Sequence, residues 1–167
     1  LMIKKILKLV FPNFFLKIYK NLSLKIKRNK FSKMTTKEVF KEIYEKKLWS
    51  PEVEKKKFKF YSGSGSHNKD FSEKYINEVS KFLITFENKP DVVDLGCGDF
   101  IIGSKLRKFC NKYVAIDIFD DLIHYNKTIY NDLNVEFKVC DITEDELPSG
   151  EICFVKRTAE VFAKITM

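Results

Sequence analysis

The sequence predicts an α/β fold built on a doubly wound parallel sheet, preceded by N-terminal helices. The first observation is the stretch DVVDLGCGDFIIG at residues 91–103, where β-branched residues lead through a glycine turn into an apolar helix start. This order is typical of a buried strand that ends in a tight turn, the place where open α/β sheets bind nucleotide-like cofactors. The second observation is the regular alternation of strand and helix patterns from residue 90 onward.

The elements after residue 90 follow one another with short links, which favours parallel strands joined by crossovers. Their hydrophobic patterns predict strands at 91–95, 113–118, 135–139 and 152–155, with helices at 101–110 and 121–131. The repeated strand–helix units and their short links therefore predict a parallel, doubly wound sheet.

Residues 34–89 predict a helical region that contains a glycine- and serine-rich loop. Capping boxes, in which the N-cap residue is followed three positions later by Glu, predict helix starts at Thr35 and Asp70. Between these helices, FYSGSGSH at residues 60–67 offers bare backbone amides. The loop could cradle a carboxylate or phosphate, or it could be a plain linker.

Residues 1–33 form a basic segment with ten Lys or Arg and no Asp or Glu, whereas the remaining chain holds 21 basic and 23 acidic residues. Lysines interleaved with apolar residues predict short amphipathic helices, which either contact an anionic membrane surface or pack on the rest of the protein. Because the positive excess is confined to this segment, we expect no nucleic-acid partner.

The remaining composition predicts a cytoplasmic protein, with peripheral contact at the inner membrane face through residues 1–33 as an option. The longest uncharged run near the start, residues 9–16, is too short to span a bilayer, and no signal-peptide pattern follows. The 4 cysteines include no CxxC pair and no His at zinc-ligand spacing, so we expect reduced thiols and no metal site.

Three nucleotide-binding motifs contain a glycine turn of this kind, and two of them do not fit this sequence. The dinucleotide fingerprint requires a glycine three residues after Gly98, where this chain has Ile101. The phosphate loop of nucleotide triphosphatases requires Lys before Ser or Thr. Here Ser104 and Lys105 stand in the reverse order, which turns the lysine by about 100° away from the phosphates.

The third motif fits: an acidic residue precedes GxG, and a second acidic residue ends the next strand. Asp94 precedes Gly96 and Gly98, and Asp117 follows 23 residues after Asp94. A cofactor with a ribose diol, an adenine and an amino-acid tail suits this set, because carboxylates accept ribose hydroxyls and glycines let the backbone approach the tail. Asp141, after the third strand, could accept from the adenine amino group. The alternative, in which each aspartate only caps a helix or turn, stays open.

The stretch VVDLGCGDF at residues 92–100 resembles the first motif of the class I S-adenosylmethionine-dependent methyltransferases. More narrowly, VFKEIYEKKLW, SGSGS, DLGCGDF, YVAIDIFDDLIHYNK and CDITEDELP are similar to a bacterial group found in surface-polysaccharide gene neighbourhoods, over residues 35–155. The resemblance implies a Rossmann-like core, S-adenosylmethionine as cofactor, and a small-molecule or sugar hydroxyl as methyl acceptor. It implies cofactor contacts from Asp94, Gly96, Cys97, Gly98, Asp117, Ile118, Asp141 and Ile142, with Ser64, Gly65 and Ser66 closing over the cofactor.

The sequence does not identify a catalytic residue. His124 lies inside a predicted helix, and His67, beside the glycine loop, is the better candidate for a general base. After EICFVK the chain departs from the resemblance, so we expect residues 90–167 to hold only the first four strands of a truncated methyltransferase domain. A non-catalytic remnant and another Rossmann-like nucleotide-binding enzyme are the alternatives.

Overall fold

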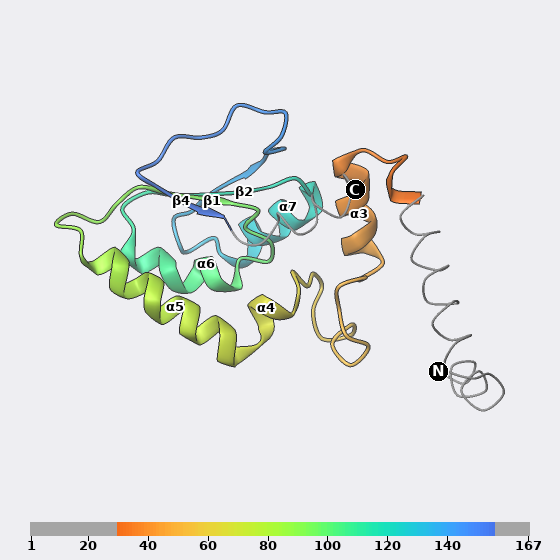
Figure 1. The fold of residues 1–167 in the computed structure, drawn as a ribbon, viewed down its shortest axis with the longest axis horizontal. Helices are drawn as coiled ribbons and strands as arrows, with labels where there is room; N and C mark the ends of the chain where they lie inside the picture. Colours follow the sequence, from red (N-terminus) through yellow and green to blue (C-terminus); the bar gives the residue numbers. More distant parts are fainter. Residues whose placement is uncertain (1–29, 156–167) are drawn as a thin grey trace, which may run out of the picture.

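The fold is a four-stranded parallel sheet, with helices against one face and the long link before the last strand across the other (Figure 1). The computed structural model describes residues 30–155. Its strands, in the spatial order β3-β2-β1-β4, are β1 (Val92–Leu95), β2 (Tyr113–Asp117), β3 (Glu136–Val139) and β4 (Ile152–Val155). Because β2 and β4 lie on opposite sides of β1, the chain winds both ways from β1, which confirms the predicted doubly wound sheet.

The helices differ in length from their sequence-based expectation more than the strands do. They are α3 (Thr36–Glu45), α4 (Ser64–His67), α5 (Lys69–Ile84), α6 (Ile101–Leu106), the 3₁₀ turn η1 (Arg107–Phe109) and α7 (Asp120–Ile129). The helix predicted over residues 101–110 ends early because its last turn tightens into η1, as helix termini often do. Among residues 30–155, no helix is both long enough and apolar enough to cross a bilayer.

The two predicted capping boxes have different outcomes. Thr35 caps α3 as predicted, because its hydroxyl accepts from the Glu38 amide and the Glu38 carboxylate accepts from the Thr35 amide. The capping box at Asp70 is wrong: α5 begins at Lys69, and the Asn68 side chain accepts from the amides of residues 70 and 71. An Asn one position before the helix takes the N-cap role as readily as Asp does.

The core occupies both faces of the sheet, because successive side chains of a strand point to opposite sides. The face beneath α5, α6 and α7 buries one alternate set of strand residues, which includes Val92, Tyr113, Ala115 and Phe154. The opposite face buries the other set, Val93, Leu95, Val114 and Ile116, beneath the link from residue 140 to residue 151. The strands β1 and β2 are therefore buried throughout.

Two sequence-based expectations lie outside the described residues. The amphipathic helices predicted in the basic segment fall in residues 1–33, of which only the last four are described. The expectation about the chain beyond β4 falls in residues 156–167.

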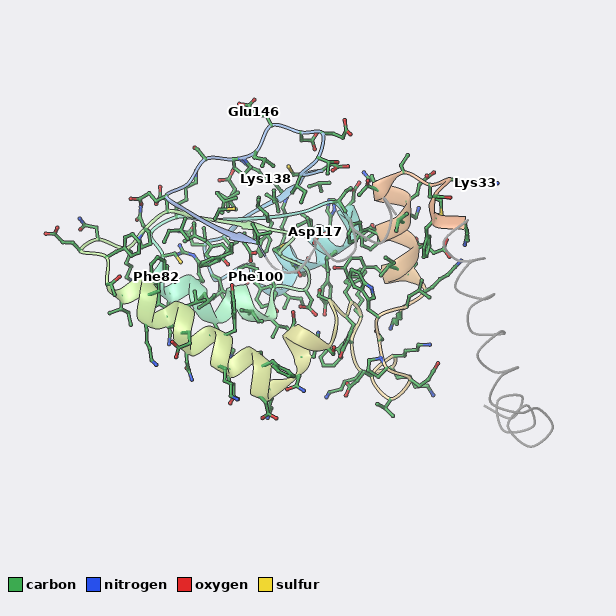
Figure 2. All side chains as sticks on the ribbon, viewed as in Figure 1. Lys33, Phe82, Phe100, Asp117, Lys138 and Glu146 are labelled. Carbon is green, nitrogen blue, oxygen red and sulfur yellow. The ribbon has the colours of Figure 1, made fainter. Side chains whose placement is uncertain are left out.

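Gly103→Ala is expected to lower the free energy of unfolding by about 1–3 kcal/mol, because overpacking a filled core forces neighbours off their rotamers. A Cβ at Gly103 would overlap the ring of Phe100. That ring lies between the sheet and α6 (Figure 2) and is enclosed edge-on by Tyr113, Tyr130 and Phe137. Urea denaturation of both proteins measures the difference.

The matched control is Gly65→Ala, also a glycine within a helix. A Cβ at Gly65 would meet no atom within 4 Å. We expect this substitution to leave stability unchanged or slightly raised. Equal effects of the two substitutions would contradict the packing described for Gly103.

Candidate functional site

A small pocket opens at the carboxyl edge of the sheet, where the parallel strands β1, β2 and β3 end together. Its walls come from four segments of the chain: Thr36, Phe40, Gly96, Asp117, Ile118, Cys140, Asp141 and Ile142. Asp117 lies at the end of the sheet nearest α3 (Figure 2). A wider hollow along the outer face of α5 contains none of the predicted site residues.

The structure brings five of the eight predicted cofactor residues into this pocket, namely Gly96, Asp117, Ile118, Asp141 and Ile142. Asp94, Cys97 and Gly98 do not line it. Thr36, Phe40 and Cys140 line the pocket without having been predicted. Cys140 directly precedes Asp141 and could have been found from the strand end, but no local signal links Thr36 or Phe40 to a turn some 60 residues away.

The glycine turn after β1 is held against the neighbouring strand. Gly96 and Gly98 have φ of 75° and 57°, the left-handed region that glycine adopts without a Cβ penalty. The amides of Gly96 and Cys97 both donate to the Ile116 carbonyl, at 3.0 and 2.8 Å. A Cβ at Gly98 would also overlap the Ser62 side chain. Glycine is therefore required at residue 98 for both conformation and space.

Asp117 is a buried carboxylate, 6% exposed, that ends β2 and binds this turn. Its Oδ2 accepts from the Gly98 amide at 3.0 Å, and its Oδ1 accepts from the Phe119 amide at 3.2 Å. Burial raises the pKa of Asp117 to about 6, although these backbone donors act in the opposite direction. Each carboxylate oxygen has a further lone pair, so Asp117 can still accept from a hydroxyl in the pocket.

Asp94 is buried in β1, two residues before Gly96, and does not line the pocket. Its position in β1 shares the face of Val92, and its Oδ2 accepts from the Tyr113 hydroxyl at 3.0 Å within the core. Burial raises the pKa of Tyr113 well above its ordinary value, so the phenol stays a donor. Asp94 shares the sheet face of Asp117, because it pairs with Ala115, two residues before Asp117 in β2, and its charge acts with burial to raise the pKa of Asp117.

Asp141 combines a pocket position with a local turn. Its Oδ1 accepts from both the amide and the hydroxyl of Thr143, at 3.0 and 2.6 Å, as aspartates at turns commonly do. Its own amide donates to Asp145 at 2.8 Å. Asp141 therefore caps a turn, a role that the sequence left open for each aspartate, and it also lines the pocket. Ile142 beside it adds an apolar wall to the pocket.

The glycine- and serine-rich segment packs against the turn and is not a free linker. The Asp99 amide donates to Ser62 Oγ at 2.6 Å, and the Ser62 amide donates back to Asp99 Oδ2 at 3.2 Å. His67 Nε2 contacts the same oxygen at 2.5 Å, and both side chains are less than a tenth exposed. The His67 ring stacks on Tyr61, with centroids 4.1 Å apart. Residues 64–66 do not line the pocket.

His124, the other histidine considered from the sequence, is exposed on α7, where its Nδ1 contacts the Asp120 carbonyl at 2.9 Å. It lies outside the pocket. Within residues 30–155, no three or more His, Cys, Asp or Glu side chains are grouped so that they could hold a metal ion. The chemistry available in this pocket is therefore carboxylate and hydroxyl hydrogen bonding beside apolar walls.

Comparisons with known proteins give only distant structural likenesses. No family model and no curated protein matches this chain. Similar solved structures include a dimethyladenosine transferase from Plasmodium falciparum, with 18% identity and a TM-score of 0.45, over 56% of this chain and 34% of that chain. The 23S rRNA methyltransferase ErmE has 16% identity and a TM-score of 0.38, over 53% of this chain and 39% of that chain.

A third similar structure is the plantazolicin methyltransferase BpumL in complex with a monoazolic desmethylPZN analog and SAH. It has 16% identity and a TM-score of 0.43, over 78% of this chain and 49% of that chain. The present chain thus spans between a third and a half of the length of these three proteins. At such identities and TM-scores, the likenesses do not assign the chain to a family.

The expectation that excluded a nucleic-acid partner is wrong. One of the similar structures, ErmE, is a 23S rRNA methyltransferase. The exclusion was drawn from the near-neutral balance of the chain after residue 33, but net charge does not decide what a site on this kind of fold accepts. Nucleic acid therefore stays among the classes of molecule with which the protein could interact.

Asp117→Asn is expected to remove a pH-dependent part of the stability. The folded pKa of about 6 lies above the ordinary value of 3.8 for an aspartate, so between these values the folded state binds more protons than the unfolded state. The free energy of unfolding should therefore fall as pH rises from 4 to 6 and then level off, by at most about 3 kcal/mol from this group. Urea denaturation across this range should show a smaller fall in the variant.

Asp121→Asn is the matched control, because Asp121 is an exposed carboxylate of α7. The free energy of unfolding of this variant should depend on pH as that of the unmodified protein does. A profile of Asp117→Asn with the same fall between pH 4 and pH 6 would contradict the burial described for Asp117.

His67→Leu is expected to lower the free energy of unfolding by about 3 kcal/mol, because it leaves the Asp99 carboxylate buried without its side-chain partner. The double variant His67→Leu/Asp99→Asn should lose less than the sum of the single variants, with a coupling of about 1–3 kcal/mol. Urea denaturation of the four proteins gives this coupling. The control is His124→Leu, which replaces an exposed histidine and should change the free energy of unfolding little. Additive effects of His67→Leu and Asp99→Asn would refute the pairing of His67 with Asp99.

Proposed function

We propose that this protein binds S-adenosylmethionine and is a methyltransferase. The observation that carries the proposal is the pocket in which Asp117, at the end of β2, meets the glycine turn after β1 and the strand-end residues Asp141 and Ile142. In open α/β sheets, cofactors bind outside the carboxyl ends of the strands, at the point where the winding reverses. That point in this chain is β1, which lies between β2 and β4.

The donor set suits the nucleoside part of the cofactor. Asp117 has spare lone pairs for the two ribose hydroxyls, and Ile118 and Ile142 give apolar walls to a planar base. Asp141 would accept from the adenine amino group. The same residues suit a nicotinamide dinucleotide less well, because Ile101 stands where that fingerprint requires glycine.

The methionine part would extend from the pocket along the turn formed by Gly96, Cys97 and Gly98. Gly96, at the entrance to this turn, is half-buried and has no side chain that would block the ligand. Asp94, buried beneath the turn, would act by supporting it and not by touching the nucleoside. When bound, the cofactor supplies a sulfonium methyl group for in-line transfer, a reaction that depends mainly on proximity and alignment.

The acceptor that we propose is a hydroxyl group of a small molecule or sugar, in line with the resemblance to methyltransferases of surface-polysaccharide gene neighbourhoods. Hydroxyl acceptors require removal of a proton, which calls for a base near the sulfonium. His67 is the histidine closest to the glycine turn, through Asp99. Because it does not line the pocket, we assign it no catalytic step.

Calorimetric titration tests the cofactor directly. We expect S-adenosylmethionine and S-adenosylhomocysteine to bind the full chain and NAD not to bind. Asp117→Asn should weaken binding of both adenosyl ligands by about 1.5–3 kcal/mol, because hydrogen bonds from the ribose to a charged acceptor are lost. Asp121→Asn, outside the pocket, should bind as the unmodified protein does. Equal affinity of Asp117→Asn would count against the ribose role, and tight NAD binding would count against the cofactor.

A further inference from the structure

Helix α3 forms one wall of the pocket although it precedes the glycine turn by about fifty residues in the sequence. Thr36 and Phe40, which are four residues apart and therefore on one face of the helix, line the pocket opposite the strand ends. Figure 1 shows α3 standing beyond the carboxyl edge of the sheet, apart from the helices that cover the sheet face.

The pocket is too small in this structure for the ligand that its residues suit. Its volume is about 30 Å³. A cavity of that size holds about one or two waters, whereas sites for cofactor-sized ligands run to several hundred Å³. A nucleoside can therefore enter only if one wall of the pocket moves outward.

The walls that come from the sheet are fixed by backbone hydrogen bonds. The Gly96 amide donates to the Ile116 carbonyl at 3.0 Å, and the Cys140 amide donates to the Asp117 carbonyl at 3.0 Å. Strands β1, β2 and β3 pair in continuous parallel register behind them. Moving Gly96, Asp117 or Cys140 would break this backbone pairing.

Helix α3 is held in a different way, through side chains. The backbone hydrogen bonds at its two ends run within residues 35–48. Phe40 and Tyr44 of α3 pack in a buried cluster with Phe60, Phe119 and Leu122. The Tyr44 ring stacks on Phe119, with centroids 5.3 Å apart, and Lys37 forms an exposed ion pair of 2.9 Å with Asp120. Because exposed ion pairs contribute little, the packing of this aromatic cluster is what holds α3 in place. Of the pocket walls, α3 is the one that can shift without breaking backbone pairing.

We propose that α3 is a movable wall of the nucleoside pocket, and that Phe40 contacts the base once α3 has moved outward. The inference rests on the proposed function, because the nucleoside of the cofactor is the occupant. Phe40, Ile118 and Ile142 together would enclose a planar ring with apolar surface, and the Thr36 hydroxyl adds a donor at the same wall. Residues 34–89 are in this way part of the cofactor site.

Trp49 reports the position of α3. It is the single tryptophan of the chain, and its ring lies edge-on to Phe40 and Tyr44, with centroids 6.0 and 5.6 Å away. The experiment titrates the full chain with S-adenosylhomocysteine and, separately, with adenosine, following heat by calorimetry and Trp49 emission by fluorescence. We expect a saturable change of Trp49 emission whose midpoint equals the calorimetric Kd.

Variants at Phe40 separate the movement from the contact. In Phe40→Ala the vacated space admits the nucleoside without displacement of α3, so the change of Trp49 emission on binding should be largely lost. Phe40→Leu keeps most of the side-chain volume but not the aromatic face, so it should retain the emission change and bind about threefold to tenfold more weakly. If Phe40→Ala does not fold, Phe40→Leu still tests the contact. Val39→Ala, a buried residue of the same helix outside the pocket, is the matched control and should keep the Kd and the emission change.

The outcomes distinguish this inference from the proposed function. Binding heat without a change of Trp49 emission, or an equal emission change in Phe40→Ala, overturns the movable wall and leaves cofactor binding standing. An unchanged Kd in Phe40→Leu overturns the contact. Heat from Phe40→Ala but not from the unmodified protein supports a wall that closes the site. No heat from either folded protein overturns both the inference and the proposed function.

Discussion

The hydrogen bond from the Gly98 amide to the Asp117 carboxylate is the interaction on which the rest of the site depends. It joins the turn after β1 to the end of β2, and it can form because the parallel register sets Leu95 beside Ile116 at the ends of these strands. The turn then faces the strand end at close range, with Ile116 accepting from two of its amides. One carboxylate in this way fixes the floor of the pocket.

This arrangement costs stability that the surrounding packing has to offset. A carboxylate as buried as Asp117 is disfavoured in its charged form, which is why burial raises its pKa to about 6. The left-handed Phe100 after the glycine turn adds backbone strain, and Phe100 is held there by the aromatic cluster beneath the sheet. The buried Asp117 carboxylate still has lone pairs that the backbone donors leave free, so it is suited to accept from a ligand. The same burial that weakens the fold therefore favours binding.

The segment before β1 belongs to the site as much as the sheet does. Ser62 and His67 both bind Asp99, the residue directly after the glycine turn, and Tyr44 stacks on Phe119, just after Asp117. These contacts tie residues 35–67 to the two strand ends that carry the candidate chemistry. The pocket is therefore a property of four chain segments, and a fragment that begins at β1 would lack one of its walls.

What the sequence determined by itself is local. The four strands, the glycine turn and the Thr35 capping box were predicted within a residue or two, because β-branched runs, glycines and a capping pair act on neighbouring backbone. The acidic residues at the strand ends were predicted for a similar reason, since parallel strands end on one edge.

What the tertiary structure alone decided is which side chains meet at that edge of the sheet. Asp94 binds the Tyr113 hydroxyl across neighbouring strands, and Thr36 and Phe40 reach the pocket from a distant helix. The place of Thr36 and Phe40 depends on the packing of α3 beside the sheet, and a one-dimensional pattern has no signal for contacts between residues so far apart in the chain.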